Sequence, residues 1–171
     1  MTTILGIDPG SRITGYGLIK EDRQRLLYID SGCIRTSEGE LSQRLLQIFN
    51  GICQLMEEFS PNEVAIEQIF MHQNPNSALK LGHARGVAMV ACASHRVHVN
   101  EYSAREVKQT VVGYGAADKN QVKQMVVHLL MLNKAPQTDA SDALAVAICH
   151  SHMKNGLLSK GQRQGRRSTA R

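Results

Sequence analysis

The sequence lacks several features that would place it outside the cytoplasm. No apolar run approaches the ~18 residues that a membrane-spanning helix needs, so we expect no membrane segment. The amino terminus lacks a basic stretch followed by an apolar region and a cleavage site, so we expect no signal peptide. The four cysteines have no Cys-x-x-Cys spacing. They indicate buried free thiols in a reducing, cytoplasmic setting rather than a disulfide framework.

The residue groupings of covalent catalysis are also missing. No Ser/His/Asp or Cys/His set points to a nucleophile, and the seven histidines are scattered along the chain. No internal repeat is visible. With 171 residues and 42% hydrophobic content, the chain has the length and composition of one globular domain. The sequence therefore favours chemistry that relies on bound ions over chemistry that proceeds through a covalent intermediate.

The net charge of +5 is concentrated at the carboxyl terminus. Residues 1–158 hold equal numbers of acidic and basic side chains, and the last thirteen residues hold five basic ones and no acid. We therefore expect a folded domain over residues 1–156 and a disordered, basic tail over residues 157–171. Within the domain, residues 68–138 carry eight bases and three acids, which favours a polyanionic partner on that part of the surface.

The pattern of apolar residues predicts an α/β domain. Strands are expected over residues 3–8, 12–20, 25–35, 64–67 and 97–102, the first three as an antiparallel meander. Helices are expected over residues 41–59, 76–95, 119–132 and 139–154, and a further one begins after Ser103, whose spacing to Glu106 is that of a capping box. This order describes a five-stranded mixed sheet flanked by helices.

Four acidic residues occupy unusual positions in this pattern. Asp8 and Glu67 each end an apolar strand, and Asp139 and Asp142 share one face at the start of the last helix. A cluster of carboxylates is the kind of hard oxygen ligand that Mg²⁺ or Mn²⁺ prefers. The residues alone leave another interpretation open, in which Asp8 is a turn residue, Asp139 a helix cap and Glu67 an ordinary strand-end acid.

Several segments resemble the RuvC-type Holliday junction resolvases, and the resemblance extends from residue 3 to about residue 152. It is carried by residues 6–11 (GIDPGS), 14–17 (TGYG), 65–68 (AIEQ), 78–82 (ALKLG), 84–86 (ARG), 107–113 (VKQTVVG) and 139–145 (DASDALA). The resemblance implies a ribonuclease H-like fold and a homodimer that binds four-way junction DNA. It also implies symmetric paired nicks with 5′-phosphate and 3′-hydroxyl ends, and work with the RuvA–RuvB branch-migration complex.

The resemblance assigns roles to individual residues. Asp8, Glu67, Asp139 and Asp142 fall on the catalytic metal-binding positions, where two Mg²⁺ ions per subunit, or Mn²⁺ in their place, would drive phosphodiester hydrolysis. Phe70, Lys108 and Lys119 fall on positions that the resemblance gives a role in DNA contact, and Arg85 is a further basic candidate for a phosphate contact. Phe70 would stack on bases, although a phenylalanine tucked beneath its own loop is also compatible with the sequence.

Small residues at four-residue spacing, Ala78, Gly82 and Gly86, lie on the helix that the resemblance places at the dimer interface. Packing of this helix against the chain's own sheet is the alternative. Three other functions also fit parts of the sequence: a ribonuclease H-like nuclease acting on RNA–DNA hybrid, a branched-DNA-binding module that does not cut, and an actin-like ATPase. The chain is too short for the two related domains of the last.

Overall fold

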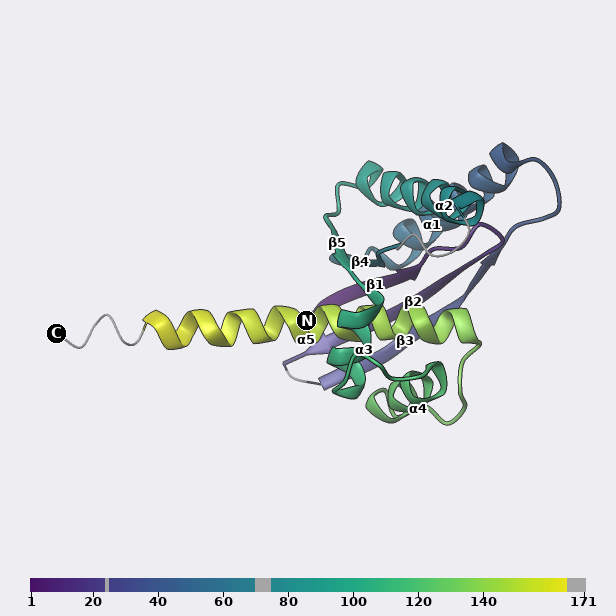
Figure 1. Cartoon of the computed structure of the whole chain (residues 1–171). Coiled ribbons are helices and arrows are strands. Elements are labelled where there is room, and N and C mark those ends of the chain that lie inside the picture. Colours follow the sequence, from purple (N-terminus) through teal and green to yellow (C-terminus); the bar gives the residue numbers. More distant parts are fainter. Residues whose placement is uncertain (24, 70–74, 166–171) are drawn as a thin grey trace.

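A computed structural model describes the backbone of residues 1–23, 25–69 and 75–165, and the side chains of these residues except 75 and 157–165. Five strands and five helices follow one another in it (Figure 1). In chain order they are β1 (Thr2–Asp8), β2 (Ile13–Asp22), β3 (Arg25–Arg35), α1 (Leu41–Phe59), β4 (Glu63–Glu67), α2 (Pro75–Ser94), β5 (Val99–Tyr102), α3 (Ala104–Val112), α4 (Lys119–Leu129) and α5 (Thr138–Gly165).

The strands form one mixed sheet in the order β3-β2-β1-β4-β5. The first three strands are an antiparallel meander, and β4 and β5 run parallel to β1. The expected five-stranded mixed sheet is thus confirmed. Its parallel half brings the carboxyl ends of β1 and β4 side by side, which is where ligands commonly bind in α/β sheets.

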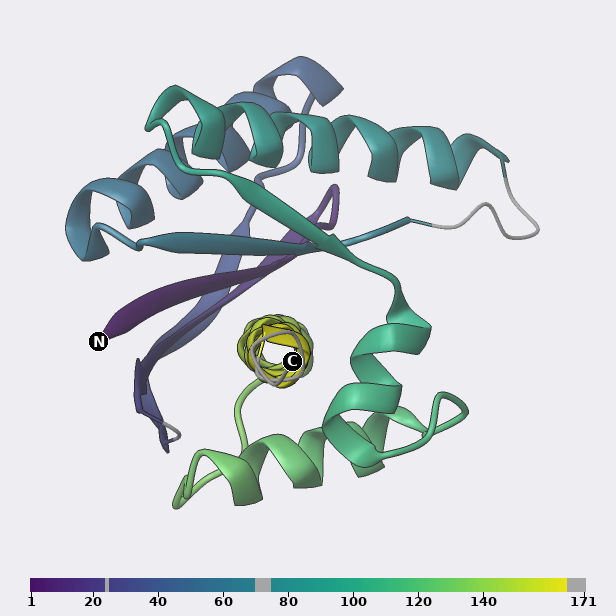
Figure 2. The same cartoon turned by 90° about the vertical axis from the view of Figure 1, so that its left-hand side faces the viewer.

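Helices cover both faces of the sheet (Figure 2). On one face, α1 and α2 pack against strand residues such as Leu5, Ile7 and Ile66. On the other face, α5 lies directly on the sheet, with α3 and α4 outside it, around a core that includes Ile4, Ile19 and Leu144. Two apolar layers therefore form, and the strands alternate between them with the period of two that strand geometry imposes.

Three glycines allow α5 to lie unusually close to the sheet. A Cβ atom on Gly6 would collide with the backbone of Ala143 and Ala147, and one on Gly15 would collide with the carbonyl of Asp139. A Cβ on Gly17 would come within 2.7 Å of Leu144. These contacts set how closely α5 packs against β1 and β2.

Several elements differ in length from the sequence-based expectation, and the largest differences are in β5, in α5 and in α4, which ends at Leu129 instead of residue 132. Strand β5 starts at Val99 instead of residue 97, because α2 ends in a turn in which Arg96 adopts a positive φ of 61°. Helix α5 extends to Gly165, beyond the expected end at residue 154 and past the domain boundary that we predict at residue 156. In the described part of the chain, no helix combines the length and apolar character needed to cross a membrane.

Candidate active site

The first two acids of the site are placed by strand alternation and by parallel pairing. Along β1, Ile4, Gly6 and Asp8 face α5, and Asp8 is the last residue of the strand. Strand β4 pairs with β1 in a register that matches Ile7 with Ile66, so Glu67 follows at the same level as Asp8. Both carboxylates therefore leave the carboxyl ends of neighbouring parallel strands on the same face of the sheet.

The other two acids come from the first turns of α5. The contact of Gly15 with the carbonyl of Asp139 brings the start of the helix onto β2 beside Asp8, since Gly15 is paired with Asp8 in the sheet. The amide of Ser141 donates a hydrogen bond to the carbonyl of Gln137 and closes the first turn. Asp142, three residues after Asp139, then lies on the same face of the helix and points toward the sheet's edge.

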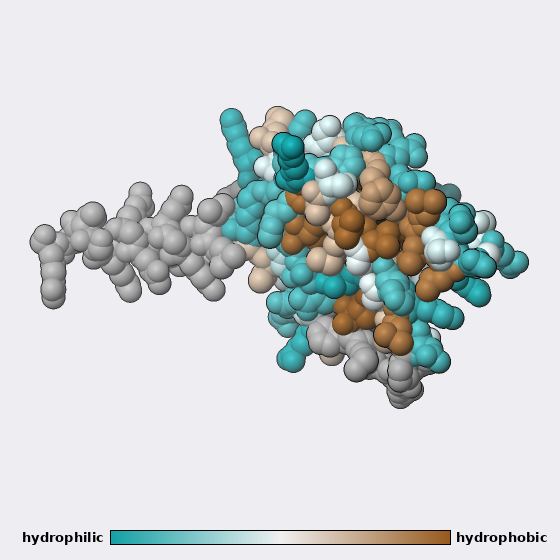
Figure 3. Space-filling model, turned by 90° about the horizontal axis from the view of Figure 1, so that it is seen from above, coloured by the Kyte–Doolittle hydropathy of each residue, from teal (hydrophilic) through white to brown (hydrophobic). Residues whose placement is uncertain are grey.

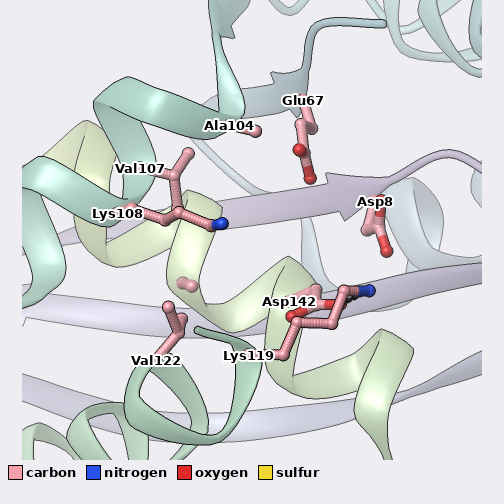
Figure 4. Close-up of a pocket in the computed structure, with 9 residues that line it drawn as sticks. Asp8, Glu67, Ala104, Val107, Lys108, Lys119, Val122 and Asp142 are labelled. Carbon is pink, nitrogen blue, oxygen red and sulfur yellow. Dashed lines mark hydrogen bonds and ion pairs between the residues drawn. The ribbon is translucent and has the colours of Figure 1, made fainter. Parts of the chain in front are cut away.

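A cavity of about 220 Å³ gathers these acids with two lysines (Figure 4). Three carboxylates line it, those of Asp8, Glu67 and Asp142, together with Lys108 from α3 and Lys119 from α4. The remaining wall is apolar and consists of Ala104, Val107, Val122 and Ala145. Asp139 is half-buried at the helix start and is not among the residues that line this cavity.

Burial and mutual repulsion make Asp8 a weak acid. Burial is the largest cause that raises its pKa to about 8, followed by the negative charges of Glu67, Asp142 and Asp139. A carboxyl group whose pKa is raised by burial and by neighbouring acids is typical of a site that binds a cation.

Lys119 supplies part of that balance in this structure. Its Nζ lies 3.3 Å from Oδ2 of Asp142, and the carboxylate of Asp142 raises the pKa of the lysine. Burial still raises the pKa of Asp142 and of Glu67. Sequence reasoning missed this pairing, because it found no base near the acids along the chain. The capping box of Asp118 and Gln121 places Lys119 at the first position of α4, beside α5.

The residues fit a divalent cation in their chemistry. All three acids of the cavity offer hard oxygen donors and come from three different elements. Among the described residues, however, no three His, Cys, Asp or Glu side chains are already arranged as a metal site. Repulsion between the carboxylates and the competing ion pair of Lys119 with Asp142 both oppose a closer approach of the acids when no cation lies between them.

The other predicted site residues have different surroundings. Lys108 lines the cavity with its amine directed toward the carboxylates (Figure 4). Arg85 forms an ion pair with Glu101 of β5 and does not line the cavity. Phe70 lies outside the described residues. A second cavity of about 200 Å³, on the side of Asp8 and Glu67 that faces α2, ends at Ile69 and Leu81.

The mixed sheet, the helix packed on its face and the acids at the ends of β1 and β4 define a ribonuclease H-like nuclease domain. The yeast mitochondrial Holliday junction resolvase Ydc2 has the same fold, with a TM-score of 0.63 at 16% identity over 85% of this chain and 76% of that one. This likeness concerns the fold alone.

The family follows from closer relatives. The family model described as "Crossover junction endodeoxyribonuclease RuvC" matches residues 4–150, and the chain belongs to this family of metal-dependent nucleases. A crossover junction endodeoxyribonuclease RuvC of Legionella pneumophila is 76% identical over 92% of this chain and 91% of its own length. Thermus thermophilus RuvC in complex with Holliday junction substrate superimposes with a TM-score of 0.84 at 30% identity, over 90% of this chain and 95% of that one.

Proposed function

We propose that this chain is an endonuclease that resolves four-way DNA junctions in recombination and repair by symmetric paired nicks with 5′-phosphate and 3′-hydroxyl ends. The observation that carries the proposal is the cavity into which β1, β4 and α5 each direct one carboxylate, in a chain of the RuvC family. The solved Thermus thermophilus relative was captured with a Holliday junction substrate, which supports the same substrate class here.

The acids serve this reaction by holding Mg²⁺, two ions per subunit, and Mn²⁺ is expected to substitute. When bound, such a pair of ions supplies the Lewis-acid chemistry of in-line phosphodiester hydrolysis. Asp8, Glu67 and Asp142 would hold them from the cavity wall, and Asp139 would join from the helix start. Lys108 and Lys119 would contact phosphate oxygens of the strand to be cut, which positions DNA without reading its sequence.

The outer face of α2 supports a homodimer. Leu79 and Val90 on this helix are 62% and 61% exposed, and apolar side chains gather over this side of the molecule (Figure 3). A Cβ on Gly82 or Gly86 would meet nothing within 4 Å, so packing within the chain does not require glycine at either position. The close approach that these small residues permit is therefore available to a second copy, whose two-fold symmetry would match that of the junction.

Further contacts with DNA are proposed for residues around the cavity. Phe70 directly follows Ile69, which ends the second cavity beside Asp8 and Glu67. An aromatic residue at the next position of the chain is suited to stacking on an unpaired base. Arg85 pairs with Glu101 through one nitrogen, and the other N–H groups of its guanidinium would contact a phosphate. The basic tail after residue 156 would add salt-sensitive, non-specific affinity for DNA.

Cellular setting and partners are carried over from the family resemblance. The four cysteines are free thiols, as a reducing cytoplasm maintains. We propose that the enzyme acts there on junctions that the RuvA–RuvB complex has moved. Binding of the dimer to junctions loaded with RuvA and RuvB, measured against bare junctions, tests the partnership.

Cleavage of matched substrates tests the proposed function. A mobile four-way junction, linear duplex, single strand and RNA–DNA hybrid of the same sequence are incubated with the protein, with Mg²⁺ or with EDTA. We expect paired nicks in the junction alone, and only with Mg²⁺. Equal cutting of linear duplex would refute the resolvase function, preferential cutting of the hybrid would identify another ribonuclease H-like nuclease, and binding without cutting would identify a binding module.

A further inference from the structure

A second polar cluster lies at the opposite end of β4 from the site. The imidazole of His150, on α5, donates from Nε2 to a carboxylate oxygen of Glu63 at 2.9 Å. Its Nδ1 lies 2.8 Å from the hydroxyl of Tyr102, which then acts as the donor. Lys154 donates to the other oxygen of Glu63 at 2.6 Å. His150 is 6% exposed, so the two hydrogen bonds of its imidazole are largely shielded from water.

The cluster is connected to the site through the strands. Glu63 and Glu67 are the first and last residues of β4, and the alternation of the strand puts them on the same face. Tyr102 is the register partner of Glu67 on β5, and its carbonyl accepts a hydrogen bond from the amide of Gln68 at 2.8 Å. His150 thus ties α5 both to the start of β4 and to the residue paired with Glu67.

The glycine contacts mainly set a different quantity, the distance of α5 from the sheet. A Cβ atom on Gly6 or Gly17 would collide with the backbone of α5, so the packing is close at both positions. Hydrogen bonds are directional and also set the position along the helix axis, and besides His150 and Lys154, Asn155 of α5 donates such a bond to Glu21 of β2 at 2.6 Å. A slide by one residue moves Asp142 by about 1.5 Å, and an error of about 1 Å in a catalytic geometry is costly.

We infer that Tyr102, His150 and Glu63 are positioning residues, which fix the axial position of α5 so that Asp142 meets Asp8 and Glu67 in a geometry that a divalent cation can use. Eight residues separate His150 from Asp142, so the helix transmits the constraint over about 12 Å. The expected effect on the cleavage rate rests on the proposed function. The expected effect on Mg²⁺ binding does not depend on it.

Two substitutions remove the directional bonds with little change in volume. Tyr102→Phe deletes one hydroxyl, and His150→Leu removes both bonds of the imidazole. Asn100→Ala is the matched control, because Asn100 lies on the same strand as Tyr102 but donates to the carbonyl of Val64 and so links β5 to β4 and not to α5. Each variant is assayed well below its melting temperature.

Three quantities are measured for each variant: the single-turnover cleavage rate, the junction Kd without metal, and the rise in melting temperature that Mg²⁺ produces. We expect His150→Leu to lower the cleavage rate by about 10- to 100-fold and to reduce the Mg²⁺-induced shift, with the Kd unchanged. Tyr102→Phe should act in the same direction by about 3- to 10-fold. The double variant should be no worse than His150→Leu, because both substitutions break one chain of bonds.

The control separates positioning from loss of stability. Asn100→Ala should lower the melting temperature of the metal-free protein but keep the cleavage rate and the Mg²⁺-induced shift of the wild type. If His150→Leu and Asn100→Ala reduce both quantities equally, or if His150→Leu leaves both unchanged, the positioning role is refuted. Should the wild type cut no junction, the proposed function fails, whereas the Mg²⁺-induced shift still tests the positioning role.

Discussion

Glu63 and Glu67 occupy the two ends of one five-residue strand and face the same helix, yet their surroundings are opposite. Glu63 receives hydrogen bonds from Lys154 and His150, and these partners lower its pKa even though burial opposes the change. Glu67 lies beside Asp8 and Asp142, and burial, followed by the negative charge of Asp142, raises its pKa. The carboxylate at the first residue of β4 has hydrogen-bond donors as partners, whereas the carboxylate at the last residue lies among other acids.

The difference shows where this fold gives up stability for function. A carboxylate that accepts hydrogen bonds from a lysine and a histidine contributes to folding, whereas a carboxylate beside other acids costs free energy until a cation arrives. Both environments are built by the same helix, whose late residues carry the donors and whose first turns carry the acids. Substitutions at the two ends should therefore change activity and stability in different proportions.

The largest effect is expected for Asp8→Asn. The substitution replaces a carboxylate at the centre of the cluster of acids with a neutral amide, which holds a metal ion less well. The cleavage rate should therefore fall about 10³-fold, which corresponds to a loss of several kcal/mol of transition-state stabilisation. Junction affinity should persist, because the charge repels rather than attracts DNA. Gel shift in EDTA and single-turnover cleavage in Mg²⁺ measure the two properties. Loss of junction binding together with cleavage would show that Asp8 serves the fold.

Effects of intermediate size are expected on the free energy of unfolding of the metal-free protein, which Glu63→Gln and Glu67→Gln should change in opposite directions. Glu63→Gln weakens two charge-assisted hydrogen bonds and should lower the free energy of unfolding by about 1–2 kcal/mol at pH 7. Glu67→Gln relieves repulsion and should raise it by up to about 1 kcal/mol. Urea unfolding in EDTA measures both. Destabilisation of equal size by the two substitutions would contradict the contrast between the two ends.

The pH dependence gives this contrast a second test. The lowered pKa of Glu63 means that its contribution to stability is present above the ordinary value of 4.5 and is lost as the pH falls through its folded-state pKa. The raised pKa of Glu67 means that its cost is absent below 4.5 and appears as the pH rises through its folded-state pKa. The gap in stability between the two variants should therefore be widest well above pH 4.5, narrow as the pH falls through the range on either side of that value, and close in acid.

The arrangement of the acids was accessible from the sequence, because it depends on local patterns. Asp8 and Glu67 directly follow apolar strand residues, and the spacing of Asp139 and Asp142 puts them on one helix face. Strand alternation and helical periodicity need no knowledge of distant partners, so patterns of this kind predict both the sheet and the candidate site.

Pairings between distant residues were not accessible in the same way. Lys119 meets Asp142 across 23 positions, and His150 meets Glu63 across 87. The residues next to Lys119 or His150 in the sequence do not identify the partner of either side chain, because both contacts depend on how α4 and α5 are placed on the sheet. The sequence showed His150 only as one histidine among seven. Its two buried hydrogen bonds distinguish it once the tertiary structure is known.

The smallest changes in the free energy of unfolding are expected for substitutions of two lysines, Lys119 and Lys154. Lys119 is 75% exposed and lies 3.3 Å from Asp142, whereas Lys154 is 30% exposed and lies 2.6 Å from Glu63. Lys119→Met should therefore alter the free energy of unfolding by less than about 0.5 kcal/mol, and Lys154→Met should lower it by about 1 kcal/mol.

Activity should reverse that order. Lys119→Met removes a cation from the cavity wall and should slow cleavage by about 10-fold, because a charged contact with the scissile phosphate is lost from the transition state. Lys154→Met leaves His150 bonded to Glu63 and should slow cleavage less than 3-fold, a change of below about 0.7 kcal/mol. Urea titrations and single-turnover rates on the two purified variants measure both orders. A larger loss of activity in Lys154→Met than in Lys119→Met would show that Lys119 does not act on the DNA.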